Sequence, residues 1–166
     1  TLMEENLTPA ARHGNDDKIL TKTMINNYAK NDLLPAPYKK KYSKEHVLLL
    51  IFIYYFKGVL SINDIQALLQ PLTTKYFQGE SALSLEDIYN EVFSLEAAQV
   101  EKLSEDVRRQ YEKSFETFPD ACDEEREFLQ KFSFICMLSF DVYVKKLLIE
   151  KLIDELPPVQ ADKKER

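Results

Sequence analysis

Glycine is scarce in this chain, and this scarcity limits the folds that are open to it. Only three of the 166 residues are glycine, at positions 14, 58 and 79. No stretch alternates apolar and polar residues for long, whereas apolar residues recur at the three- and four-residue spacing of amphipathic helices. A chain of this length buries a core without disulfides or metals. The sequence therefore predicts an all-α protein.

Capping residues and prolines set the expected helix boundaries. Ser and Thr side chains cap helix N-termini, and the residue before a proline is pushed out of the helical region. These signals predict helices over residues 21–30, 43–57, 61–71, 84–115 and 123–156, with a loop at 8–20 and a linker at 71–83. Either Thr21 or Thr23 caps the first helix. Residues 84–115 form either one long helix or two collinear ones with a restart at Ser94. We expect Gly58 to stop the second helix, which is apolar on all sides and forms a buried spine. We likewise expect residues 132–144, including Cys136, to be the centre of a second core.

Charge is distributed unevenly along the sequence. The whole chain has a net charge of -6, with 22 basic and 28 acidic residues. Residues 18–57 nevertheless contain eight lysines against two acidic residues, a net charge of +6, so the remainder carries -12. A basic module followed by an acidic one indicates a role for a particular surface, in contrast to a uniformly acidic enzyme.

Side chains that could perform catalysis or bind a metal are few. His13 lies in the expected loop and His46 in the first turn of a helix, where we expect it to be solvated or half-buried, and neither has a catalytic motif around it. The glycines are too far apart to cradle a phosphate. Cys122 and Cys136 are too few for a disulfide scaffold or a zinc site and fit a reducing compartment. We expect no enzymatic activity, no catalytic residue, no metal and no cofactor.

The apolar runs also bear on where the protein resides. The longest ones, residues 47–56 and 132–140, fall short of the ~20 residues that span a bilayer. We therefore expect no membrane segment and a cytoplasmic location.

The basic module contains the most specific chemical pattern. Thr23, Asn26, Asn27 and Lys30 are spaced i, i+3, i+4, i+7 and share one helix face, with apolar residues on the opposite face. Such a face suits a DNA major groove, because Asn pairs with adenine while Thr and Lys reach phosphates or guanine. The lysine triplet at residues 39–41, flanked by tyrosines, would follow the backbone. The alternative interpretation is a solvated helix face followed by a solvated loop.

The order of motifs resembles two families. Residues 23–28 (TMINNY), 30–37 (KNDLLPAP), 41–43 (KYS) and 60–69 (LSINDIQALL) resemble the MerR-type winged helix-turn-helix. Residues 18–155, including 139–146 (SFDVYVKK), resemble a bacterial family described as domain of unknown function 1836. MerR-type recognition helices usually carry Arg followed by Tyr-Tyr, whereas this chain has Asn26, Asn27 and Tyr28, of which Tyr28 keeps the place of the second tyrosine.

The resemblance implies a winged helix-turn-helix-like module at residues 1–72 and an acidic helical module of long helices at residues 73–166. It implies a cytoplasmic transcriptional regulator that binds double-stranded DNA. The expected DNA-binding residues are Lys22, Thr23, Asn26, Asn27, Tyr28, Lys30, Lys39, Lys40, Lys41 and Lys44. The alternative is a protein-protein interaction module that keeps the fold without DNA binding and docks partners on its acidic helices.

Assembly follows from the expected symmetry of the DNA site. Two-fold operators are read by two-fold proteins, and a helix over about 95–118 would be roughly 36 Å long at ~1.5 Å per residue. We therefore expect a homodimer paired through this helix. In the competing interpretation, the last helix of the same chain covers its apolar stripe in a hairpin.

Overall fold

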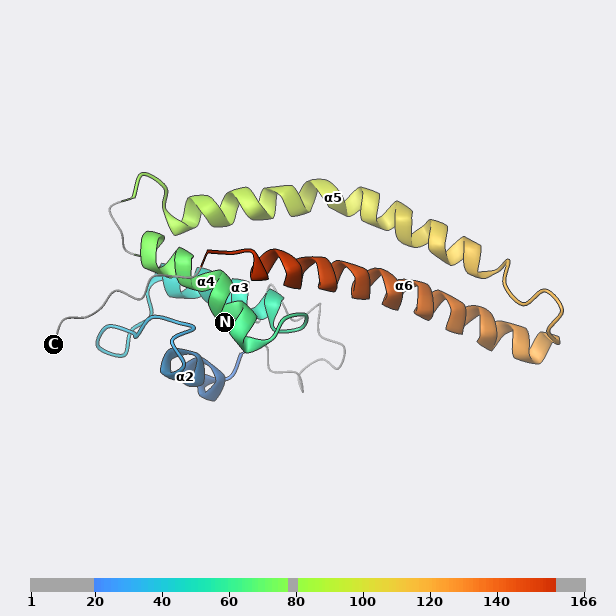
Figure 1. Cartoon of the computed structure of the whole chain (residues 1–166), viewed down its shortest axis with the longest axis horizontal. Coiled ribbons are helices and arrows are strands. Elements are labelled where there is room, and N and C mark those ends of the chain that lie inside the picture. Colours follow the sequence, from blue (N-terminus) through green and yellow to red (C-terminus); the bar gives the residue numbers. More distant parts are fainter. Residues whose placement is uncertain (1–19, 78–80, 158–166) are drawn as a thin grey trace. The chain divides into compact units, whose positions relative to one another are not determined.

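The computed structural model describes residues 20–77 and 81–157, without the side chains of residues 96–98. Its helices in chain order are α2 (Lys22–Lys30), α3 (Lys44–Phe56), α4 (Ile62–Tyr76), α5 (Leu85–Ser114) and α6 (Asp123–Asp154) (Figure 1). These ranges contain no strand, only an isolated bridge between Tyr38 and Lys41. The prediction of an all-α protein is confirmed for the described residues. Nearly all of the expected loop at residues 8–20, with His13, lies outside them.

The chain divides into two compact units. The first, here called the N-terminal unit, holds the described residues up to Asp87 together with Glu155 to Pro157. The second, the hairpin unit, is Ile88–Asp154. The change of unit thus falls near the start of α5. No helix in the described ranges is both long enough and apolar enough to pass through a membrane.

The helix starts agree with the capping signals of the sequence. The Thr21 side chain accepts a hydrogen bond from the backbone N–H of Met24 at 3.1 Å, which satisfies a donor that has no partner within the helix. The Ser61 hydroxyl accepts from the Asp64 N–H at 3.2 Å, and Asp64 accepts in return from the Ser61 N–H. The same reciprocal box links Ser84 and Asp87. The two predicted boxes are confirmed, and of the two candidate caps of α2 the structure shows Thr21.

The prediction that Pro71 ends its helix is wrong. α4 continues to Tyr76 with Pro71 inside it, so the linker expected at 71–83 begins later. Packing beyond the proline offsets the backbone hydrogen bond that proline removes. Phe77, which follows the helix, places its ring edge-on to His46 with the ring centroids 4.8 Å apart. Sequence around the proline contains no sign of this distant contact.

α3 forms the core of the N-terminal unit, as its uniform hydrophobicity predicts. Leu49 and Ile53 are fully buried, and Ile65 and Leu69 of α4 are buried as well. The helix ends at Phe56, with Lys57 as its C-cap. Gly58 does not provide a left-handed stop, because its φ lies outside that region and an added Cβ would meet no atom within 4 Å.

α5 and α6 form an antiparallel hairpin that is held together at its turn (Figure 1). The Gln130 amide donates to the backbone carbonyl of Phe115 at 2.9 Å. The rings of Tyr111 and Phe134 meet edge-on with centroids 5.2 Å apart. The apolar stripe of α5 thus contacts α6 of the same chain here, as the competing interpretation of the stripe expects. Phe118 adopts a left-handed φ of 55° within the turn that joins the two helices.

The prediction that residues 132–144 form the centre of a second core is wrong. Phe132, Ile135 and Phe140 expose 52%, 58% and 68% of their surface, and Cys136 is exposed. The physical reason is that α5 covers one side of α6 within the hairpin unit, whereas α6 is apolar on nearly every side. The hydrophobicity of α6 favours burial, but within the hairpin unit these side chains stay exposed.

Candidate nucleic-acid interface

The outward face of α2 carries the polar residues that the sequence singles out. Lys22, Thr23, Asn26, Asn27 and Lys30 are all exposed. Together they provide hydroxyl, amide and ammonium groups on one short helix of nine residues. Within the described part of the chain these lysines form no ion pair. Among the described residues, the ammonium groups of Lys22 and Lys30 can therefore donate to a ligand.

Buried residues on the other side hold this helix in place. Tyr28 is buried, and burial raises the pKa of its hydroxyl. Asp32 adopts a left-handed φ of 56°, and the Leu33 N–H donates to the Tyr28 carbonyl at 3.0 Å, which closes the helix in a Schellman-type turn. Leu33 and Leu34 are then fully buried. Tyr28 was expected to be a DNA-binding residue, but the structure places it in the core, so we remove it from the candidate interface.

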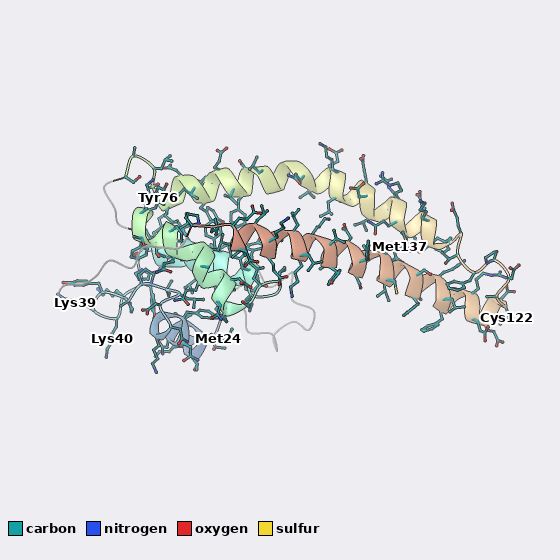
Figure 2. All side chains as sticks on the ribbon, in the orientation of Figure 1. Met24, Lys39, Lys40, Tyr76, Cys122 and Met137 are labelled. Carbon is teal, nitrogen blue, oxygen red and sulfur yellow. The ribbon has the colours of Figure 1, made fainter. Side chains whose placement is uncertain are left out.

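The lysine triplet forms a tight, strained turn. Lys39 and Lys40 have φ values of 48° and 61°, and the Lys41 N–H donates to the Tyr38 carbonyl at 2.9 Å. Positive φ at both central residues is the pattern of a type I′ turn, which usually contains Asn-Gly. For two lysines this conformation costs on the order of 1 kcal/mol or more each. Figure 2 shows both side chains pointing away from the N-terminal unit.

The surroundings of this turn are basic and aromatic. Tyr38 exposes 74% of its surface, and the Lys39 ammonium lies over its ring, 5.1 Å from the centroid. Lys40 and Lys41 are exposed and form no ion pair among the described residues. A tip that presents three lysines and an open aromatic ring matches a surface that binds phosphates.

Lys44 differs from the other lysines. Its ammonium forms an ion pair with Glu86 at 2.5 Å, and both side chains are about half exposed. The acidic segment therefore neutralises one edge of the basic region. Lys44 is less available to phosphate than the other predicted residues.

His46 connects the two ends of the lysine loop, a role that the sequence did not reveal. Its side chain is 2% exposed, which corrects the expectation that it is solvated or half-buried. The Ser43 N–H donates to its Nδ1 at 3.0 Å, so in the neutral ring Nε2 carries the proton and donates to the Pro35 carbonyl at 3.2 Å. Residues 36–42 are thereby closed at their base. In the sequence, the one signal for this role is that His46 follows the helix-capping Ser43 by three residues.

Metal-binding chemistry has no support in the described residues. They contain no group of three or more His, Cys, Asp or Glu side chains placed to hold a metal ion. The candidate site is thus a surface of amide, hydroxyl and ammonium groups.

Comparisons with known proteins identify one family. A family model described as "Domain of unknown function (DUF1836)" matches residues 1–92. The match covers the whole candidate interface and the first turns of α5. The resemblance that we inferred up to residue 155 is supported as far as residue 92. Searches of curated proteins and of solved structures gave no match to the chain.

Proposed function

The chain belongs to the DUF1836 family, whose description names no activity, and from its surface chemistry we propose that the protein is a DNA-binding transcriptional regulator. In this proposal the N-terminal unit acts as a MerR-like winged helix-turn-helix, with α2 as the recognition helix and residues 36–42 as the wing. It would act in the cytoplasm as a homodimer on a two-fold DNA site. No chemical step is part of this function.

The observation that carries the proposal is the two-sided character of α2. Asn26, Asn27 and Thr23 are exposed, while Tyr28 on the other side is buried and Leu33 and Leu34 anchor the helix end. A short helix that is anchored from behind can enter a major groove without losing contact with its own core. In this proposal the exposed amides donate to and accept from adenine, because an asparagine amide carries both a donor and an acceptor.

The lysine turn supports a second contact, to the phosphate backbone. Strained non-glycine turns are retained where they serve a function. Here the strain projects Lys39 and Lys40 outward, and the His46 link holds the base of the loop. We assign phosphate binding to Lys39, Lys40 and Lys41.

The salt dependence of binding to duplex DNA tests the phosphate contacts. Each phosphate contact lowers log K by ~0.9 per unit of log salt. The triple variant Lys39→Ala, Lys40→Ala, Lys41→Ala should flatten the slope by up to ~3 units and weaken binding to all sequences alike. The triple variant Lys102→Ala, Lys113→Ala, Lys131→Ala, at three exposed lysines of the hairpin unit, removes the same charge and is the matched control, which should leave the slope unchanged.

Sequence preference tests the recognition helix separately. Asn27→Ala should remove a base contact worth ~1–3 kcal/mol and relax the preference among selected DNA fragments, with the salt slope nearly intact. Asn63→Ala, at an exposed asparagine of α4, serves as its control. Equal effects of the two variants would contradict the assignment of α2.

A protein-interaction module is the rival function. The Lys44–Glu86 pair favours it, because it shows acidic residues neutralising part of the basic region, and so does the exposed apolar surface of α6. If the full-length protein shows no binding to duplex DNA at low salt in a shift assay, this second function takes the place of the first.

A further inference from the structure

The middle of α6 exposes large apolar side chains that the rest of the hairpin unit does not cover. Among the described residues of α6, Ile153 alone is buried. A helix that is hydrophobic on all sides is normally found inside a core. The described residues of the hairpin unit do not bury it, so we consider this surface as a contact for another molecule.

One side of α6 is already used within the chain. Gln130 donates to the Phe115 and Thr117 carbonyls, and Ser133 lies 3.3 Å from the Thr117 hydroxyl. One turn further, Met137 helps to line an open cavity of about 330 Å³ together with Gln110 of α5. At helical spacing, positions 130, 133 and 137 define the side that faces α5.

The opposite side of α6 carries a second apolar stripe, which we call the outer stripe. Its members are spaced alternately four and three residues apart, the heptad spacing of coiled coils. Ser139 and Lys146 occupy two of its seven positions, and the apolar members are Phe128, Phe132, Ile135, Val142 and Ile149. They expose between 38% and 68% of their surfaces. A heptad stripe of this kind packs against another helix.

The area of this surface matches that of a stable protein interface. Tyr143 flanks the outer stripe and is 57% exposed. At about 100 Å² for each half-exposed large side chain, the five apolar members and Tyr143 expose on the order of 600 Å². One partner of a standard interface buries about 800 Å².

The charge distribution along α6 favours a second copy of the same helix. Residues 123–131 contain four carboxylates against two cations, a net charge of -2, whereas residues 141–154, up to the end of α6, contain three lysines against three carboxylates, a net charge of 0. An antiparallel second α6 keeps the two acidic ends apart and places each beside the neutral, lysine-containing end of the other copy, whereas a parallel one would place both acidic ends together. In the antiparallel pair the two helix dipoles run in opposite directions, which is the favourable arrangement. In a two-fold dimer every contact also occurs twice.

We propose that the outer stripe of α6 is the homodimer interface and that two hairpin units pack antiparallel through it. The interface thus lies on α6, and not on the α5 segment from 95 to 118 that the sequence predicts. The polar positions Ser139 and Lys146 set the register, as isolated polar residues do in coiled coils. This inference rests on the proposed function in one respect, namely that a two-fold DNA site requires two copies of the chain. The test of the interface itself requires no DNA.

Sedimentation velocity of the full chain over a range of concentrations tests the interface. We expect the wild-type mass to be twice the 19.4 kDa of one chain at micromolar concentration. Val142→Glu, in the outer stripe, should shift it to a single chain. Val100→Glu is the matched control, because this valine of α5 is equally exposed, at 56% against 59%, and lies outside the stripe. It should leave the dimer intact.

Circular dichroism of each variant separates loss of the interface from loss of the fold. If Val142→Glu lowers helicity, Ile135→Gln provides a milder substitution in the same stripe, and it should still weaken the dimer at least tenfold. A wild-type chain that stays monomeric at all concentrations overturns the proposal, as do equal effects of Val142→Glu and Val100→Glu. A monomer that sediments with vesicles of zwitterionic and anionic phospholipids would assign the stripe to a lipid surface instead.

The DNA experiments remain independent of these outcomes. A dimer that binds no duplex DNA would reject the proposed function and retain the interface. A monomeric wild-type chain with a salt-dependent affinity that needs Lys39, Lys40 and Lys41 would do the reverse.

Discussion

Replacing the strained lysines by the residues that favour their conformation should stabilise the protein and weaken DNA binding at the same time. Lys39 and Lys40 both adopt positive φ, at 48° and 61°. Asn at the first position and Gly at the second are the preferred residues of such a turn. The double variant Lys39→Asn, Lys40→Gly keeps the backbone and removes two positive charges.

The magnitude follows from two opposing terms. A non-glycine residue in the left-handed region costs ~1–2 kcal/mol, which Gly avoids and Asn reduces. Gly also adds freedom to the unfolded chain, which costs ~0.4–1 kcal/mol. We expect a net gain of about 1 kcal/mol in the free energy of unfolding, or a rise in Tm of roughly 2–4 °C at this chain length.

Urea unfolding and DNA titrations of the same sample measure both effects. The midpoint should rise without a change in m-value, while the salt slope of binding should fall by nearly 2 units, at ~0.9 per lost contact. The charge-conserving variant Lys39→Arg, Lys40→Arg should change neither quantity appreciably. A double variant that is less stable than the wild type would refute the assignment of strain to this turn, and an unchanged salt slope would refute the phosphate contacts.

Two further predictions concern the ends of helices. His46→Ala should lower the free energy of unfolding by about 3 kcal/mol, because it leaves the Ser43 N–H and the Pro35 carbonyl without their partner; a loss below about 1 kcal/mol in urea unfolding would contradict the link. Hydrogen bonds from Ser84 lower the pKa of Asp87 below its ordinary value of 3.8. The cap therefore stabilises α5 above pH 3.8 and loses its effect as the pH falls through the lower folded pKa. An NMR titration should place the Asp87 pKa below that of an unfolded peptide and Ser84→Ala should return it, whereas equal values in both proteins would argue against the cap.

The sequence by itself determined the helical class and most helix starts of the described chain. A Ser or Thr side chain interacts with a backbone group two or three residues away, so all partners of a cap lie within one short segment. The boxes at Ser61 and Ser84 could therefore be predicted without any tertiary contact. For α2 the sequence narrowed the cap to Thr21 or Thr23, and the structure shows Thr21. The exposed face of α2 was readable for the same reason, because the helical period alone places Asn26 and Asn27 together.

Only the tertiary structure decided which side chains are buried. It also decided where the backbone keeps a conformation that the local sequence disfavours. α4 continues through Pro71, and Phe77 just beyond its end packs against His46, a residue from another helix. Tyr28 is part of the core, although its position in the motif indicated a contact residue. Hydrophobicity along the sequence states that a side chain favours burial but not which molecule supplies the cover. The apolar middle of α6 is the clearest case, since its neighbour α5 covers one side and leaves the outer stripe exposed.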